Sequence, residues 1–227
     1  MRMLDLFCGR FGWGRAFAAR GWDVVGVDLV EPPEVPVGCE FVQGNIMDLR
    51  WNSWGAWIMN GPTLGHFDFI CASSPCEQFS VHGMKHFHPN PPYPELGIKL
   101  FNHTRSLCEA SGVPYVMENV RAAQQFVGNA VSHCGPFYLW GNSVPPILPQ
   151  GIKKGMTTAG VDMTKLTPEQ RKIERKKYAH SRVCGWGRGS GKGPTVEETA
   201  KAATIPPELS NAVCDYAERI CEERMSA

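Results

Sequence analysis

The sequence lacks the features of membrane and secreted proteins. No apolar run approaches the roughly 20 residues that a helix needs to span a bilayer. The N-terminal residues show neither the basic start nor the small-residue cleavage site of a signal peptide, so we expect none. The nine cysteines are odd in number and irregularly spaced, which argues against a disulfide framework and for reduced thiols. These absences predict a cytoplasmic protein without a membrane partner.

The sequence also has no internal repeat, no strong charge excess and no metal-binding pattern. Of its 227 residues, 43% are hydrophobic and 20% are charged, and the formal net charge is +1. Such a composition is typical of a soluble globular protein, and the length suits one domain with a small appendage. No usual zinc spacing is formed by His82, His86 and His88 with Cys108 or Cys134, so we expect no metal.

Basic residues gather in one segment of the chain. Residues 165–192 contain nine Lys or Arg against two acids, which makes this segment a candidate contact for a polyanion such as a nucleic acid. A solvated helix face is the alternative. A helix start is predicted by Thr167 as N-cap, Pro168 at the first position and Gln170 three residues after the cap. That helix would carry the basic residues, and Gly185–Gly193 would follow as a flexible loop.

Strands and helices are expected to alternate along the rest of the chain. Residues 2–7 form an apolar run before a glycine-rich turn, residues 15–20 favour a helix, and Val24–Val27 form a β-branched strand that ends at Asp28. This is the βαβ opening of a nucleotide-binding sheet. Further strands are expected at Glu40–Val42, Phe67–Ala72, Tyr115–Glu118 and Phe137–Trp140, with helices at Leu96–Ser111 and from about Glu208 to Glu223. The prediction is an α/β, Rossmann-like, mostly parallel sheet with helices on both faces.

Three tryptophans and a long loop fall outside this alternation. Trp51, Trp54 and Trp57 recur every third residue, a spacing that suits the buried face of a helix. Residues 82–95 are rich in proline and histidine, which indicates a long surface loop, and loops of that length are often functional.

Residues able to carry chemistry follow the predicted strands. Cys76 comes just after Phe67–Ala72, where α/β proteins bind ligands, although it could also be one of nine inert thiols. Glu118 and Asn119 end another apolar strand, where an acid is costly unless it has a partner or a function. A pair that merely fixes a loop is the alternative. Asp28 is placed to accept hydrogen bonds from ribose hydroxyls, and the glycine spacing argues against NAD or FAD.

Taken in order, these segments resemble the motifs of the C5-cytosine DNA methyltransferases. They read Asp-Leu-Phe-x-Gly, an acid after the second strand, Gly-x-Ile-x-Asp-Leu, Pro-Cys-x-x-Phe-Ser and Glu-Asn-Val. The similarity runs from Leu4 to about Val120 and resumes weakly at Ile205–Pro207. It implies the fold of a class I methyltransferase with S-adenosylmethionine as donor and S-adenosylhomocysteine as product. It also implies a monomer that acts on a flipped cytosine in double-stranded DNA.

The resemblance implies a role for each matching residue. Cys76 would add to C6 of the base, Glu118 would hold and protonate N3, and Asn119 would support that glutamate. The cofactor contacts implied are Asp5, Phe7, Gly9, Gly12, Asp28, Asn45, Ile46 and Pro75. The expected DNA contacts are Ser80, Lys85, Arg175, Lys176, Lys177, Arg182 and Arg188, mostly to phosphates.

The resemblance also predicts how the chain is divided. Residues 1–140 would form the catalytic and cofactor-binding core, residues 141–195 a short, irregular target-recognition insert, and residues 196–227 a segment that returns to the core. Because the insert is short, we expect a short or loose recognition sequence. The small size favours a solitary or phage-encoded enzyme over one linked to restriction.

Four positions depart from the family. Phe11 occupies a place in the turn where the family has glycine, and Asn45 replaces an aspartate. The family's base-holding arginine is absent from residues 130–140, with His133, Arg121 or Arg182 as candidate substitutes. Ala202-Ala203 replaces a late Gly-Asn. These departures leave two alternatives to an active DNA methyltransferase: a weak or inactive protein that binds DNA or protein, and an RNA cytosine methyltransferase.

Overall fold

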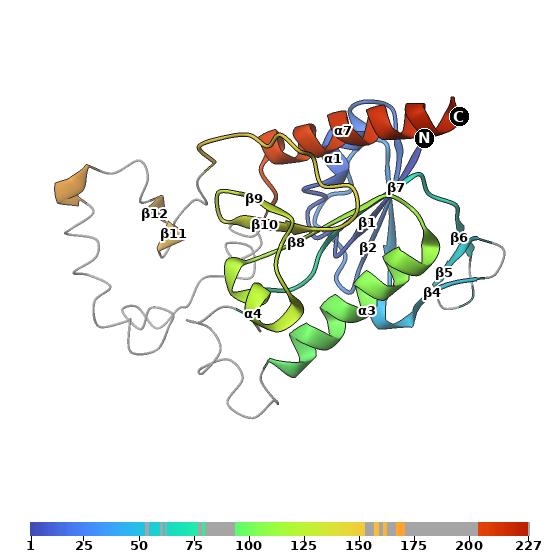
Figure 1. Ribbon diagram of the computed structural model, residues 1–227, viewed down its shortest axis with the longest axis horizontal. Helices are drawn as coiled ribbons and strands as arrows, with labels where there is room; N and C mark the ends of the chain where they lie inside the picture. The colour runs from blue at the N-terminus through green and yellow to red at the C-terminus, as the bar shows by residue number, and fades with distance from the viewer. Residues whose placement is uncertain are drawn as a thin grey trace.

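The computed structural model describes residues 1–52, 55–59, 61, 63–76, 79, 94–152, 157–158, 161–162, 167–170 and 204–226. A seven-stranded sheet forms the centre of the molecule (Figure 1). Its strands, in chain order, are β1 (Arg2–Leu6), β2 (Asp23–Asp28), β3 (Cys39–Gln43), β7 (Phe69–Ser73), β8 (Tyr115–Asn119), β9 (Ser132–Cys134) and β10 (Phe137–Trp140). In space the order is β3-β2-β1-β7-β8-β10-β9. The first five in this order run parallel to one another, and β10 runs antiparallel to both β8 and β9.

The central strands are buried on both faces because their sequences are almost continuously apolar. Successive side chains point to opposite faces of a strand, so each strand contributes to two cores. In β1, Met3 belongs to one core and Leu4 to the other, and the paired residues Phe69 and Ile70 of β7 divide in the same way. The sheet is therefore the middle layer of three.

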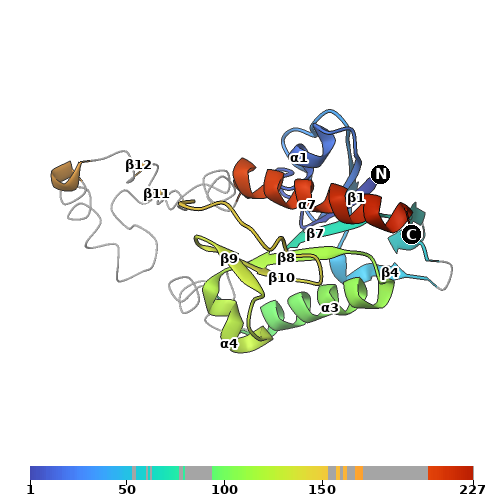
Figure 2. The same ribbon diagram turned by 45° about the horizontal axis from the view of Figure 1, so that its top comes forward.

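Helices cover both faces of the sheet, as Figure 2 shows. On one face lie α1 (Gly14–Ala18) and α7 (Pro207–Met225); on the other lie α3 (Glu95–Ser111), the short α4 (Gln124–Val127) and the 3-10 turns η1 (Ile46–Asp48) and η2 (Arg121–Ala123). The buried residues of α7 recur at helical spacing: Leu209, Val213, Cys214, Ala217 and Cys221. This architecture confirms the predicted α/β, Rossmann-like fold with a mostly parallel sheet and helices on both faces. No helix among the described residues is long and apolar enough to cross a membrane.

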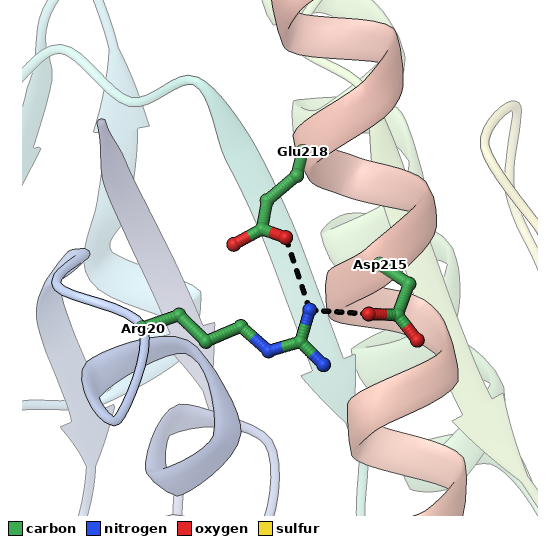
Figure 3. Close-up of polar contacts among 3 residues, drawn as sticks. All are labelled: Arg20, Asp215 and Glu218. Carbon is green, nitrogen blue, oxygen red and sulfur yellow. Dashed lines mark hydrogen bonds and ion pairs between the residues drawn. The ribbon is translucent and has the colours of Figure 1, made fainter.

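Polar contacts join α7 to the N-terminal part of the chain. Arg20, which follows α1, donates from Nη1 to Asp215 and, at 3.0 Å, to Glu218, both on α7 (Figure 3). These two carboxylates raise the pKa of the Arg20 guanidinium. At the start of α7, Ser210 Oγ donates to the carbonyl of Trp13 at 2.9 Å. The C-terminal helix is thereby attached to α1 and to the glycine-rich turn before it.

The helix suggested by the spacing of the tryptophans is wrong. Trp51 and Trp57 face each other in an antiparallel meander of β4 (Leu49–Trp51), β5 (Trp57–Met59) and β6 (Thr63–Gly65), and Trp54 lies outside the described residues. The chain reverses between the first two strands because Asn52 Oδ1 accepts from Ala56 N at 2.9 Å and Gly55 adopts φ +74. Asparagine and glycine favour such a turn over a helix.

The predicted recognition insert is described only in parts. Residues 157–158 and 161–162 form the strand pair β11 (Thr157–Thr158) and β12 (Val161–Asp162). The predicted capping box is present, because Gln170 N donates to Thr167 Oγ1 at 3.2 Å and Thr167 N to Gln170 Oε1 at 2.9 Å. The rest of the basic segment lies outside the described residues, so the domain boundaries and the recognition role remain predictions.

Candidate functional site

A cavity of about 390 Å³ opens at the carboxyl ends of the parallel strands. It lies where the strand order reverses between β1 and β7, which is where open α/β sheets bind ligands. Seven of the residues expected to be catalytic or to contact the cofactor line it: Phe7, Asp28, Asn45, Ile46, Pro75, Cys76 and Glu118. Asp5, Gly9, Gly12 and Asn119 were also predicted and do not line it. The fold therefore brings five separate sequence segments to one cavity.

Two aspartates fix the glycine-rich turn after β1. Asp28 Oδ2 accepts from Gly9 N at 2.9 Å, and Gly9 has the positive φ of +50 that favours glycine. Asp5 Oδ2 accepts from Gly14 N at 3.0 Å, at the start of α1. Gly12 is required for packing, since a Cβ there would lie 2.9 Å from the backbone N of Ile205.

Phe11 fills a gap in the core, although its backbone adopts a left-handed φ of 58 that favours glycine. Its ring is fully buried, and a Cβ on Gly26 of β2 would lie only 2.3 Å from Phe11 Cε1. Gly14 leaves room for the same ring, with Phe11 Cδ1 at 2.9 Å from its would-be Cβ. The first departure from the family is thus compensated by a glycine within the otherwise β-branched second strand.

Asp5 is a buried carboxyl group with an unusual titration. Burial is the main cause that raises its pKa from 3.8 to about 8; the bond from Gly14 N opposes the shift and the charge of Asp28 adds to it. Its Oδ1 accepts no hydrogen bond from the described residues. A buried carboxyl oxygen without a hydrogen-bond donor is costly when it is charged, which agrees with a protonated Asp5 in the folded protein.

Replacement of Asp5 by asparagine should stabilise the unliganded protein at alkaline pH. Because the folded pKa is about 8 and the ordinary value is 3.8, the folded state binds the proton more tightly. Stability from this group is therefore greatest below about pH 4 and falls as the pH rises to about 8. The asparagine side chain would keep an acceptor for Gly14 N without the charge, and we expect a gain on the order of a few kcal/mol at about pH 8.

Urea unfolding at about pH 5 and about pH 8 measures this effect. The gain should shrink at the lower pH. Asp68→Asn is the control, because Asp68 is exposed and accepts from Arg2 N at 2.7 Å, away from the turn. A gain that is the same at both pH values, or a loss, would contradict the assignment of a buried, protonated Asp5.

Asn119 connects the end of β8 to the loop that carries Cys76. It is fully buried, and its Nδ2 donates to the carbonyl of Ser74 at 2.9 Å and to Ser74 Oγ at 3.0 Å. Its Oδ1 accepts from Val120 N at 2.8 Å. Ser73 of β7 is paired in register with Glu118 of β8. Asn119 therefore holds the Cys76 loop beside the strand end that bears Glu118.

Cys76 differs from the other cysteines of the described chain in its surroundings. It is half-buried and lines the cavity, and all eight described cysteines are free thiols. Burial raises the pKa of the other seven, to about 11 for Cys39 and Cys221 and to about 12 for Cys214. Since the thiolate is the nucleophile, these seven thiols are poor candidates for covalent chemistry.

Neither of the two described candidates to replace the family's arginine, His133 and Arg121, lines the cavity. His133 is exposed, stacks on Tyr138 with ring centroids 5.0 Å apart, and has its Nδ1 3.3 Å from the carbonyl of Gly135. Arg121 is exposed at the start of η2, and Arg182 lies outside the described residues. Among the described residues that line the cavity, none is basic.

The asparagine that replaces the family's aspartate has a structural role. Asn45 Oδ1 accepts from Met47 N at 3.0 Å and so caps η1. His103 of α3 supports the same turn, with Nε2 3.2 Å from the carbonyl of Ile46. The expected adenine contacts are thus held by a capped turn at the wall of the cavity.

All expected DNA contacts fall outside the described residues. These are Ser80, Lys85, Arg175, Lys176, Lys177, Arg182 and Arg188. Sequence reasoning missed two residues near the cavity, Trp13 and Ser73, whose side chains are joined by a hydrogen bond of 2.8 Å from Nε1 to Oγ. The sequence signal that could have identified them is their position, because Trp13 follows the glycine-rich turn and Ser73 precedes Ser74-Pro75.

No protein-family model matches the chain, and no curated protein sequence matches it. Solved structures share part of its fold. One is a protein assigned as a DNA modification methyltransferase encoded within an E. coli prophage, with 20% identity, a TM-score of 0.38, and coverage of 55% of this chain and 33% of that one. Another is the glycopeptide N-methyltransferase MtfA, with 18% identity, a TM-score of 0.28, and coverage of 52% of this chain and 45% of that one. A third is the bifunctional kinase-methyltransferase WbdD, with 19% identity, a TM-score of 0.27, and coverage of 52% of this chain and 23% of that one. The matched part spans less than half of each of these proteins, and at such TM-scores the similarities carry no conclusion about activity.

Proposed function

We propose that this chain is an S-adenosylmethionine-dependent DNA (cytosine-5)-methyltransferase. The observation that carries the proposal is the shared cavity: Cys76 and Glu118, from the ends of two neighbouring strands, line it together with Phe7 and Asp28. A nucleophilic thiol, a carboxyl group and a cleft able to hold an adenosine are thus within one space of about 390 Å³. These are the parts that the chemistry of cytosine methylation requires.

The proposed mechanism starts from the weak nucleophilicity of cytosine C5. The Cys76 thiolate adds to C6, and the displaced electron pair gives C5 the character of a carbanion. Glu118 holds N3 and supplies a proton there, which stabilises the charge that develops on the ring. When bound, S-adenosylmethionine supplies a methyl group made electrophilic by its sulfonium. C5 would form a bond to that methyl as the methyl–sulfur bond breaks and S-adenosylhomocysteine leaves as the neutral thioether. Loss of the C5 proton to solvent then expels the Cys76 thiolate from C6, and return of the N3 proton to Glu118 restores the aromatic ring.

The remaining residues of the cavity bind and orient. Phe7 and Ile46 offer apolar surface for an adenine ring, and Asp28 is an acceptor for ribose hydroxyls. Asn119 fixes the position of the Cys76 loop through Ser74, so that the nucleophile is held before the base arrives. The base must leave the duplex to reach this space, and we propose double-stranded DNA as the partner.

Two other functions are tested alongside this one, because no described residue of the cavity wall is basic and the family's base-holding arginine therefore has no counterpart there. A protein of this fold could bind DNA or another protein with little or no catalysis, or it could methylate cytosine in RNA. The first would transfer little or no methyl group, and the second would transfer it to RNA instead of DNA.

Methyl transfer from labelled S-adenosylmethionine to duplex DNA and, separately, to RNA distinguishes these functions. We expect label in DNA, recovered as 5-methylcytosine, and none in RNA. Label in RNA alone would replace the proposed substrate, and no label in either would leave a binding protein. Bisulfite sequencing of DNA from an expressing host would then give the sequence context of the modified cytosines.

A further inference from the structure

The hydroxyl of Ser73 is oriented by a neighbour that can only donate. Ser73 is the last residue of β7 and lines the cavity. Its Oγ accepts from Trp13 Nε1 at 2.8 Å, and an indole N–H has no acceptor function. Ser73 must therefore be the acceptor in this bond, and its own proton remains to be donated. Among the described residues, Ser73 Oγ has no further hydrogen-bond partner.

The donor that orients Ser73 is itself rigid. Trp13 is 1% exposed, so its ring is held on all sides by the core. Its backbone carbonyl accepts from Ser210 Oγ of α7 at 2.9 Å. A buried indole held in this way limits the directions in which the Ser73 hydroxyl can point its proton, which lowers the entropic cost of using it to bind a ligand.

Ser74 repeats the same arrangement at the neighbouring position. Its Oγ accepts from Asn119 Nδ2, which is also a donor-only nitrogen, at 3.0 Å, and Ser74 also lines the cavity. Two adjacent hydroxyls are therefore turned so that each offers a proton. Ser74 is only 5% exposed, whereas Ser73 is half-buried, so Ser73 is the more accessible donor of the two.

The charge of the cavity wall indicates which kind of ligand group these hydroxyl donors can bind. The described wall contains the carboxyl groups of Asp28 and Glu118 and no basic side chain. An anionic group of a ligand has no cation to meet there and needs neutral donors instead. A hydrogen bond from a neutral donor to a charged acceptor is stronger than one between neutral groups.

We propose that Ser73 binds the α-carboxylate at the amino-acid end of S-adenosylmethionine, and that Trp13 is the positioning residue that orients its hydroxyl. The inference rests on the proposed function, because it takes the sulfonium donor as the ligand of the cavity. It adds a binding residue and a positioning residue that the resemblance to the methyltransferase family does not assign.

Calorimetric binding of two ligands tests the proposal without any reaction. S-adenosylhomocysteine has the amino-acid end, and 5′-methylthioadenosine lacks it. Ser73→Ala should weaken binding of S-adenosylhomocysteine about tenfold, the loss expected for one hydrogen bond to a charged group. Binding of 5′-methylthioadenosine should not change. Because the ratio of the two affinities is compared within one variant, a general loss of folded protein cancels.

A pair of tryptophan variants isolates the orienting hydrogen bond. Trp13→Phe removes the indole N–H and should lower the same affinity ratio, by less than Ser73→Ala does. Trp22→Phe is the matched control: Trp22 is 2% exposed, and its Nε1 has no partner among the described residues. This control should leave the ratio unchanged.

Each outcome separates the inference from the proposed function. If the wild-type protein binds neither ligand, the proposed function fails. If it binds both and Ser73→Ala lowers both affinities equally, or lowers neither, the role of Ser73 is wrong and the proposed function stands. An equal effect of the two tryptophan variants would remove the orienting role of Trp13.

Discussion

Replacement of Cys76 by serine should reduce methyl transfer to DNA by at least about a thousandfold, because the addition to C6 depends on a thiolate. A serine hydroxyl is almost entirely protonated at neutral pH and is a much weaker nucleophile than a thiolate. Binding of S-adenosylhomocysteine should be unchanged. The measurement is the rate of label transfer under single-turnover conditions, where binding and product release do not limit the rate.

Cys39→Ser is the matched control for this substitution. Cys39 is also half-buried but lies on β3, does not line the cavity, and has its pKa raised to about 11 by burial. Its replacement should leave transfer near the wild-type rate. Full activity of the Cys76 variant would show that the covalent step uses another group or does not occur.

DNA that contains 5-fluorocytosine gives a second measure of the same step. After methyl transfer, the fluorine on C5 cannot leave as a proton does, so the bond between Cys76 and C6 should persist. We expect a protein–DNA adduct that survives denaturation, located at Cys76 by peptide mass, and none with the serine variant. An adduct at another cysteine would reassign the nucleophile.

Replacement of Glu118 by glutamine should lower methyl transfer by about a hundredfold or more, the usual scale for loss of a positioned acid. The amide has nearly the same shape and can still form a hydrogen bond, but it cannot give a proton to N3. Affinity for S-adenosylhomocysteine should be retained, since the expected ligand of Glu118 is the base. Single-turnover rates and calorimetric binding separate the two effects.

Glu109→Gln provides the corresponding control outside the cavity. Glu109 is exposed on α3, where its Oε1 lies 3.4 Å from the hydroxyl of Tyr115, and the same chemical change there should not affect the rate. If the two glutamine variants have similar rates, Glu118 does not act on the base, and the carboxyl group has only a structural role.

The sheet could be predicted from the sequence because its strands carry their own signal. The apolar runs at Val24–Val27, Tyr115–Glu118 and Phe137–Trp140 all became strands, since strands covered on both faces need apolar residues at nearly every position. The meander of β4–β6 could not be predicted in this way, because its strands are only three residues long and its tryptophans recur at a helical spacing.

Residues of the cavity could be predicted only where a sequence motif lies at the end of a predicted strand. Cys76 and Glu118 were found because each follows an apolar strand at the same edge of the sheet. The hydrogen bond between Trp13 and Ser73 could not be predicted, because it joins side chains 60 residues apart and depends on how the core orients an indole. The gap that Phe11 fills could not be located from the sequence, because its partner, Gly26, is a neighbour only in the folded chain.

The close approach of Ile205 to Gly12 and the bond from Ser210 to Trp13, 197 residues apart, have a consequence for synthesis. The glycine-rich turn leaves the ribosome well before the residues that pack against it, since Ser210 follows Trp13 by 197 residues. Contacts so distant in sequence form late in folding. We therefore expect the nascent chain to carry an unfinished ligand site, and affinity for the methyl donor to appear only when α7 docks.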